Sequence, residues 1–230
     1  MFWIDPIYFW YVFIPTMLIS LGVQFYLQST FKKWGGVPNS SKITGPQTAQ
    51  QLFAKTTLNP IPVERVKGNL TDHFDPRANI VRLSDPVATQ PSVASMAVTA
   101  HELGHVQQYQ SGSGLIKLRG ALLPALQFSP TLSYVCLMFG LIFEMTNLIW
   151  LGVLFFGLMV IFSLLTVPVE LDASRRGLKL LTEAGLMKND EDRKGSRAVL
   201  TAAALTYLAA AVTSVLQLLY YVSIARRASN

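Results

Sequence analysis

The segment His101-Glu-Leu-Gly-His105 carries the strongest chemical signal in the chain. On a helix, residues four positions apart share a face, so the two imidazoles can bind one metal ion together. Glu102 would lie about 100° around the helix from His101, where it can reach a water molecule beside the ion. Zinc suits this set because its tetrahedral coordination leaves one position for water. The segment therefore predicts a zinc hydrolase in which Glu102 takes a proton from water and returns it to the leaving amine.

The alternative is a pair of core histidines on one helix face, beside Ala94 and Val98. The chain has only three histidines, and two of them occur at this spacing. The use of two of the three histidines at this spacing favours a metal site over a pair of core histidines.

Catalytic zinc has three protein ligands, so one more is expected. No third histidine follows His105 at the spacing of the long metzincin motif. Glu170 is the expected third ligand, because it directly follows an apolar run and should emerge on the same membrane side as the histidines. The alternative for Glu170 is an interfacial residue that ends an apolar helix. Glu144 is expected at the opposite membrane face. His73 is another possible ligand, although its neighbours Asp72, Asp75 and Pro76 indicate a turn.

Asp172 would point roughly 200° away from Glu170 on a regular helix, so the two carboxylates cannot bind the ion from one face. Two roles stay open for Asp172: it orients one of the histidines, or it caps a helix that restarts after Pro168. Candidates for stabilising an oxyanion are Arg175, Arg176, Tyr109 and His73.

Four long apolar stretches point to a membrane protein. Half of the residues (51%) are hydrophobic and only 14% are charged, against about 25% charged in ordinary globular chains. Each stretch holds about 20 or more mainly apolar residues, enough to cross a hydrocarbon core. The first is expected to remain as a span, because Met1–Asp5 lacks the cationic region of a cleavable signal peptide. The predicted spans are 6–28, 120–143, 147–169 and 198–224.

The basic residues predict the orientation. Segment 29–119 carries ten Lys or Arg residues and segment 170–197 carries seven, while the short connection at 144–146 has none. Basic loops favour the cytoplasmic side, so both polar segments and the active site are expected there. The formal charge of +6 does not indicate nucleic acid, because the basic residues mostly flank apolar stretches. The expected partners are the lipid bilayer and a peptide or membrane-protein substrate.

Segment 29–119 is expected to fold as a small α+β unit. Thr44-Gly-Pro-Gln47 resembles a capping box and predicts a helix to about Leu58. Residues 61–67 and 79–84 predict a hairpin, whose strand Ile80–Leu83 could bind an extended substrate by strand addition. A further helix is expected from Pro91 to about Gln110.

Three sequence segments carry a family resemblance: His101-Glu-Leu-Gly-His105, Asp72-His-Phe-Asp-Pro76 and Val169-Glu-Leu-Asp-Ala-Ser174. Among four apolar spans they resemble the YugP-type membrane zinc metallopeptidases, and the resemblance covers nearly the whole chain. It implies a zinc-dependent protease with a membrane-proximal active site. Membrane gluzincins usually place an Asp four residues after the ligand Glu, whereas this chain has Ser174.

The sequence thus predicts a mostly α, polytopic membrane protein with four transmembrane helices and a small zinc-peptidase domain at the membrane face. Its expected function is peptide-bond hydrolysis at or near the membrane surface. The polar and charged residues in 101–119 disfavour a site within the bilayer. The alternatives are a non-catalytic zinc-binding membrane adaptor, which needs no Glu102, and a transporter, which should carry charges within its spans. The expected divisions are the first helix (1–28), the metallopeptidase segment (29–119), two spans (120–169), the segment carrying Glu170 (170–197), and the last span with its tail (198–230).

Overall fold

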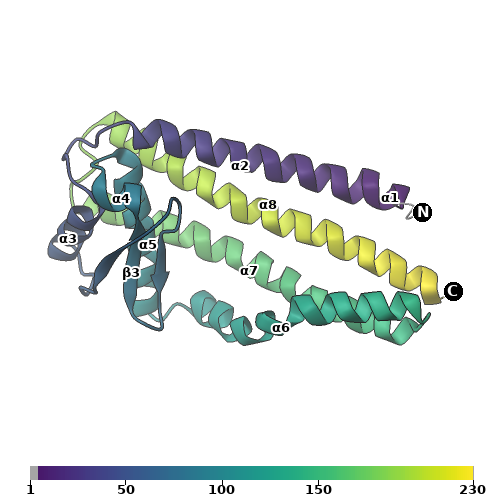
Figure 1. Ribbon diagram of the computed structural model, residues 1–230. Coiled ribbons are helices and arrows are strands. Elements are labelled where there is room, and N and C mark those ends of the chain that lie inside the picture. Colours follow the sequence, from purple (N-terminus) through teal and green to yellow (C-terminus); the bar gives the residue numbers. More distant parts are fainter. Residues whose placement is uncertain (1–4, 230) are drawn as a thin grey trace. The chain divides into compact units, whose positions relative to one another are not determined.

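The computed structural model describes residues 5–229, most of which are helical (Figure 1). They form two compact units. The apolar unit contains residues 5–23, 117–168 and 206–229, and the polar unit contains residues 24–116 and 169–205. In chain order, the elements are α1 (Pro6–Tyr8), the π-helical turn η1 (Phe9–Phe13), α2 (Ile14–Gly35), α3 (Gly45–Lys55), β1 (Val63–Val66), β2 (His73–Asp75), β3 (Ile80–Ser84), α4 (Asp85–Thr89), α5 (Val93–Gln110), α6 (Gly114–Ile142), α7 (Thr146–Glu183) and α8 (Asp190–Ser229).

Four helices in the described part of the chain are long and apolar enough to cross a membrane, which confirms the mostly α, polytopic architecture. They comprise Pro6–Gly35, Gly114–Ile142, Thr146–Glu183 and Asp190–Ser229. Each extends beyond the span predicted for it at one end or both. Helix α7 shows this best, because it runs through Pro168 and ends only before Gly185, which has a φ of +67°. Proline removes one backbone donor there, but the residues on both sides continue the helix.

The sheet differs from the predicted hairpin. Both predicted strands exist, but β1 pairs with β3 in parallel, and β3 takes its antiparallel partner from β2. The strand order is therefore β1-β3-β2. The hairpin prediction was wrong because the segment treated as a long turn contains a strand of its own. That strand, β2, returns to β3 through a tight turn after Asp75.

This strand order also corrects the proposed substrate-binding strand. Both edges of β3 are paired, so Ile80–Leu83 offers no free edge to an extended peptide. Strand β3 is instead the buried centre of the sheet, with Val81 and Leu83 fully inaccessible to solvent.

The two predicted helices of the polar unit are present with shifted ends. Helix α3 follows Thr44, whose backbone N–H donates to Oε1 of Gln47 at 2.9 Å, as a capping box requires. It ends at Lys55, three residues before the predicted end. Helix α5 is capped by Ser92, whose hydroxyl accepts from the backbone N–H of Ser95 at 3.0 Å.

Helix α5 crosses α7 at very short range within the polar unit. A Cβ atom added at Gly104 would lie 2.2 Å from the carbonyl oxygen of Ala173, and one added at Gly177 would lie 2.6 Å from that of Ala100. Real Cβ contacts are never this close, so both crossing points require glycine. The pair of glycines lets the backbones of the two helices touch, which brings their side chains within reach of a common point.

We predict that Gly104→Ala destabilises the polar unit, because the new methyl group must push α5 away from α7. Overpacking of this kind costs about 1–3 kcal/mol. Thermal unfolding of the detergent-solubilised protein measures the effect. Gly157→Ala on α7 is the matched control, since an added Cβ there meets nothing within 4 Å. Equal melting temperatures for the two variants would contradict the close crossing.

Candidate metal centre

Helices α5 and α7 bring together the three residues expected as ligands. Oε2 of Glu170 lies 3.3 Å from Nε2 of His101 and 3.3 Å from Nε2 of His105. The three side chains offer ligand atoms that all lie within 4.8 Å of one another. All three residues are buried, with exposed fractions of 8%, 8% and 2% for His101, His105 and Glu170.

The spacing of these atoms fits a zinc ion. Zinc binds imidazole nitrogen and carboxylate oxygen at about 2.0–2.2 Å. Ligand atoms at that distance from a tetrahedral centre are about 3.3–3.6 Å apart, given the bond lengths of zinc sites. The two nitrogen–oxygen separations match this edge length. The cluster therefore has the chemistry and the spacing of a three-ligand zinc site.

Gln108 determines which ring nitrogen of His105 carries the hydrogen and which carries the lone pair. Its Nε2 donates to the backbone carbonyl of Val169 at 2.9 Å and to Oδ2 of Asp172 at 2.8 Å. Both partners are pure acceptors, so this end of the amide is the NH₂ group and the other end is the oxygen. That oxygen lies 3.0 Å from Nδ1 of His105. His105 therefore donates from Nδ1, and in the neutral ring its lone pair is on Nε2, directed at the metal position.

His101 has a different neighbour. Oγ of Ser174 lies 3.2 Å from Nδ1 of His101. Ser174 is the position where membrane gluzincins usually carry an Asp, and here the shorter hydroxyl still reaches the ring. Each histidine thus has its Nδ1 in contact with a polar side chain and its Nε2 next to Glu170.

Asp172 touches neither histidine directly within the described structure. It accepts from Gln108 and from Nε of Arg176, the latter at 2.7 Å, so its influence on His105 passes through the Gln108 amide. Its other proposed role, capping a helix that restarts after Pro168, was wrong. Helix α7 continues through both residues, so no N-terminus exists at Asp172 to be capped.

Glu102 is buried beside the ligands, with 6% of its surface exposed, and it is not a member of the three-ligand set. Burial raises the pKa of its carboxyl group above the ordinary value. The neighbouring His101 and His105 oppose that shift, and the negative charges of Asp72 and Glu170 add to it. A carboxyl group with a raised pKa is suited to accept and release a proton near neutral pH.

Among the described residues, the remaining candidates do not belong to the ligand cluster. His73 is exposed on β2, with Nδ1 2.8 Å from the carbonyl oxygen of Thr71. Glu144 lies in the connection between α6 and α7, outside the polar unit. Tyr109 packs edge-on against Phe74, Arg175 is exposed, and Arg176 is engaged with Asp172.

Gln108 was not among the predicted site residues, and Ser174 was not predicted to contact a histidine. A local signal existed for both. Gln108 follows His105 by three positions, and Ser174 follows Glu170 by four, so each shares a helix face with a ligand. Nothing in the sequence, however, pairs Gln108 with Asp172, because that contact joins two different helices.

Comparison with known proteins gives one family and one curated relative. The family model described as "Putative neutral zinc metallopeptidase" matches residues 9–226. The relative is the "Putative membrane protease YugP" of Bacillus subtilis (strain 168), which is 38% identical over 216 residues, covering 94% of this chain and 96% of the relative. No solved structure matches.

We predict that Glu170→Ala weakens zinc retention, because it removes one of the three ligands and leaves only the two imidazoles. Zinc content after dialysis against a chelator measures the loss. Glu144→Ala is the control, since it removes the same side chain from the α6–α7 connection. A Glu170→Ala protein that keeps its zinc as well as Glu144→Ala would rule out Glu170 as a ligand.

Gln108→Met should lower zinc affinity about 10–100-fold, the usual effect of losing a partner that orients a ligand. The measurement is chelator competition with the metal-free protein. Gln110→Met is the matched control, because Gln110 is on the same helix but exchanges its two hydrogen bonds with the backbone of Asn59. If Asp172 acts through Gln108, adding Asp172→Asn to Gln108→Met should cause little further loss. If Asp172→Asn lowers zinc affinity as much in the Gln108→Met protein as in the wild type, then Asp172 acts on the site independently of Gln108.

Proposed function

The chain belongs to the neutral zinc metallopeptidase family, and on that premise we propose that it is a membrane-embedded endopeptidase that uses Glu102 as its general base. The observation that supports the proposal is that one buried site contains both a set of metal ligands and a separate carboxyl group. Three side chains form a ligand set, and a fourth side chain, the carboxyl group of Glu102, is buried beside that set without belonging to it. A purely structural zinc site has no use for this fourth group, whose burial costs free energy.

The proposed reaction is hydrolysis of a peptide bond. His101, His105 and Glu170 would hold the zinc ion, which would supply Lewis acidity toward water and toward the scissile carbonyl. Glu102 accepts a proton from the attacking water as its oxygen bonds to the carbonyl carbon. Glu102 then delivers that proton to the amide nitrogen, which leaves as an amine when the C–N bond breaks.

The supporting side chains keep this geometry fixed during the reaction. Gln108 and Ser174 hold the two imidazole rings through their Nδ1 atoms, so the rings cannot turn away as charge develops. Arg176 and Asp172 form a pair with an Nε–Oδ2 distance of 2.7 Å, which anchors the amide of Gln108 in turn.

The proposed substrates are peptides or membrane proteins cleaved close to the bilayer surface. Helix α5 is not one of the candidate spans, while Glu170 directly follows the apolar part of α7. A site built from these two helices suits bonds near the end of a transmembrane segment better than bonds at the bilayer centre.

We further propose that the polar unit faces the cytoplasm, because segments 29–119 and 170–197 hold seventeen of the nineteen basic residues. In a Cys136→Ala background, cysteines placed at the exposed positions Lys67 and Lys194 should resist an impermeant thiol reagent in intact cells, and one at Glu144 should react. Labelling of the cysteines at positions Lys67 and Lys194 from outside would show that the polar unit faces the opposite side of the membrane from the one proposed. Labelling of only one of them would contradict a shared side.

The decisive prediction is that Glu102→Gln keeps its zinc and loses peptide hydrolysis. The amide cannot take a proton from water, and positioned acid–base groups contribute about 10²–10⁴-fold to rates. Zinc content and cleavage of casein or a membrane peptide are measured side by side with the wild type. Undiminished cleavage by zinc-loaded Glu102→Gln would falsify the assignment. A zinc-loaded wild type that cleaves nothing would favour the membrane-adaptor alternative.

A further inference from the structure

The polar unit contains a cavity whose lining residues include none of those of the metal centre. It has a volume of about 790 Å³ and is walled by the last turns of α2, the β1–β2 loop and the α4 region. Ligand pockets in proteins measure about 300–1,000 Å³, so the cavity is large enough for a small molecule or a lipid headgroup. Its polar lining residues are Gln24, Gln28, Lys32, Asn69 and Gln90.

The α2 wall is a polar stripe on a helix that otherwise suits the membrane. Gln24, Gln28 and Lys32 are spaced by four, so they share one face of α2. No charged residue precedes Lys32 back to Pro6, so we take this stripe as the point where the candidate span leaves the hydrocarbon. Amide groups near lipid are costly unless they form hydrogen bonds. In residues 5–229, none of these three side chains has a hydrogen bond or ion pair to the rest of the chain, so their donors are available to a ligand.

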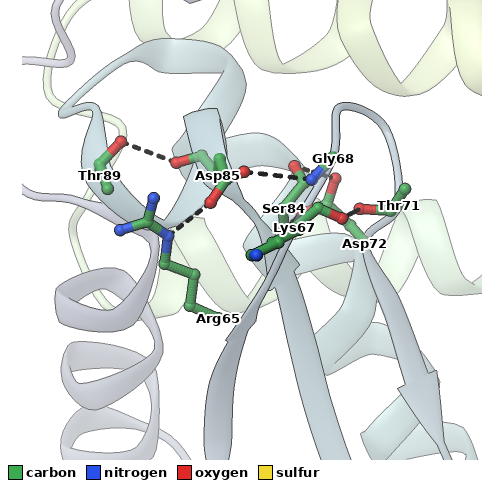
Figure 2. Close-up of polar contacts among 8 residues, drawn as sticks. All are labelled: Arg65, Lys67, Gly68, Thr71, Asp72, Ser84, Asp85 and Thr89. Atoms are coloured by element: carbon green, nitrogen blue, oxygen red, sulfur yellow. Dashed lines mark hydrogen bonds and ion pairs between the residues drawn. The ribbon is translucent and has the colours of Figure 1, made fainter.

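The loop wall is ordered in advance, as Figure 2 shows. Asp85 accepts from Nε of Arg65 at 2.6 Å and from the backbone N–H of Gly68 at 3.1 Å. At the other end of the loop, Asp72 accepts from the backbone N–H of Ser84 at 2.7 Å and from its hydroxyl at 2.8 Å. Both ends of the loop are therefore fixed, and Asn69, which lies between them, needs little reordering to bind a ligand.

The chemistry of the lining selects the ligand. The lining contains one ammonium group and four amide side chains, and no Asp or Glu. This set complements a phosphate anion that also carries hydroxyl groups. We propose that the cavity binds the headgroup of an anionic phospholipid, with its phosphate on Lys32 and its headgroup hydroxyls on the amides. The position at the end of a membrane span favours a lipid over free phosphate, because the bilayer presents lipid phosphates at this depth.

A headgroup bound here would touch the segment that supports the metal-binding helix. Directly after α2, the carbonyl of Val37 accepts from the backbone N–H of Val93, the first residue of α5, at 2.9 Å. The backbone N–H of Asn39 donates to the carbonyl of Pro91 at 3.0 Å. The lipid would therefore anchor the start of α5 at the membrane surface, whatever reaction the metal centre carries out.

The test uses the full-length protein in detergent and titrates it with phosphatidylglycerol, followed by native mass spectrometry. Lys32→Gln should bind this lipid at least about fivefold more weakly, the effect of one lysine near an anionic surface. Lys33→Gln is the matched control, because Lys33 carries the same charge next door but lies over the Trp34 ring at 5.2 Å and does not line the cavity. Gln28→Leu should also weaken binding, since it removes an amide from the lining at similar volume. Zinc content of each variant reports that the polar unit is folded.

Three results would overturn the proposal. An equal loss in Lys32→Gln and Lys33→Gln would show general attraction to a basic surface. Equal binding of phosphatidylcholine would remove the selectivity for an anionic headgroup. Displacement of the lipid by inorganic phosphate, or by a substrate peptide, would assign the cavity to that ligand instead.

Discussion

The contact between the backbones of α5 and α7 is the constraint on which the site depends. A three-ligand zinc site needs its nitrogen and oxygen atoms about 3.3–3.6 Å apart, whichever helices supply them. Two helices packed through ordinary side chains lie about 8–10 Å apart at their axes, and bulky residues at the crossing would use the upper part of that range. Gly104 and Gly177 remove those side chains at the crossing. The histidines of one helix and the glutamate of the other can then meet without long, flexible side chains.

The same contact explains why the polar groups around the site are satisfied from both helices. A buried carboxylate and two imidazoles are costly unless each is paired. Helix α5 contributes Gln108, which spans the gap to Asp172 and Val169 on α7, while α7 contributes Ser174 to His101. These hydrogen bonds stabilise the ring orientations only while the helices keep this distance. The geometry of the ligands therefore depends directly on how closely α5 and α7 pack.

The polar unit also has a rigid framework remote from the metal. Strand β3 is buried at the centre of its sheet, and the loop between β1 and β2 is tied at both ends by carboxylates that accept from backbone N–H groups (Figure 2). Such bonds hold a surface loop that would otherwise be mobile. The framework thus gives the cavity beside α2 one ordered wall, the β1–β2 loop.

Local rules in the sequence determined several features on their own. The spacing of His101 and His105 depends only on the period of a helix, and the four candidate spans depend only on apolar length, so both could be predicted. The capping box before α3 is equally local. The position of Glu170 could be predicted from topology, since a span that ends on the histidine side must bring its next residues there. Tertiary structure alone decided the rest, because it depends on contacts between distant segments. These features are the parallel pairing of β1 with β3, the unbroken course of α7 through Pro168, and the amide of Gln108 between His105 and Asp172. A helix repeat says which residues share a face, but only packing says what that face meets.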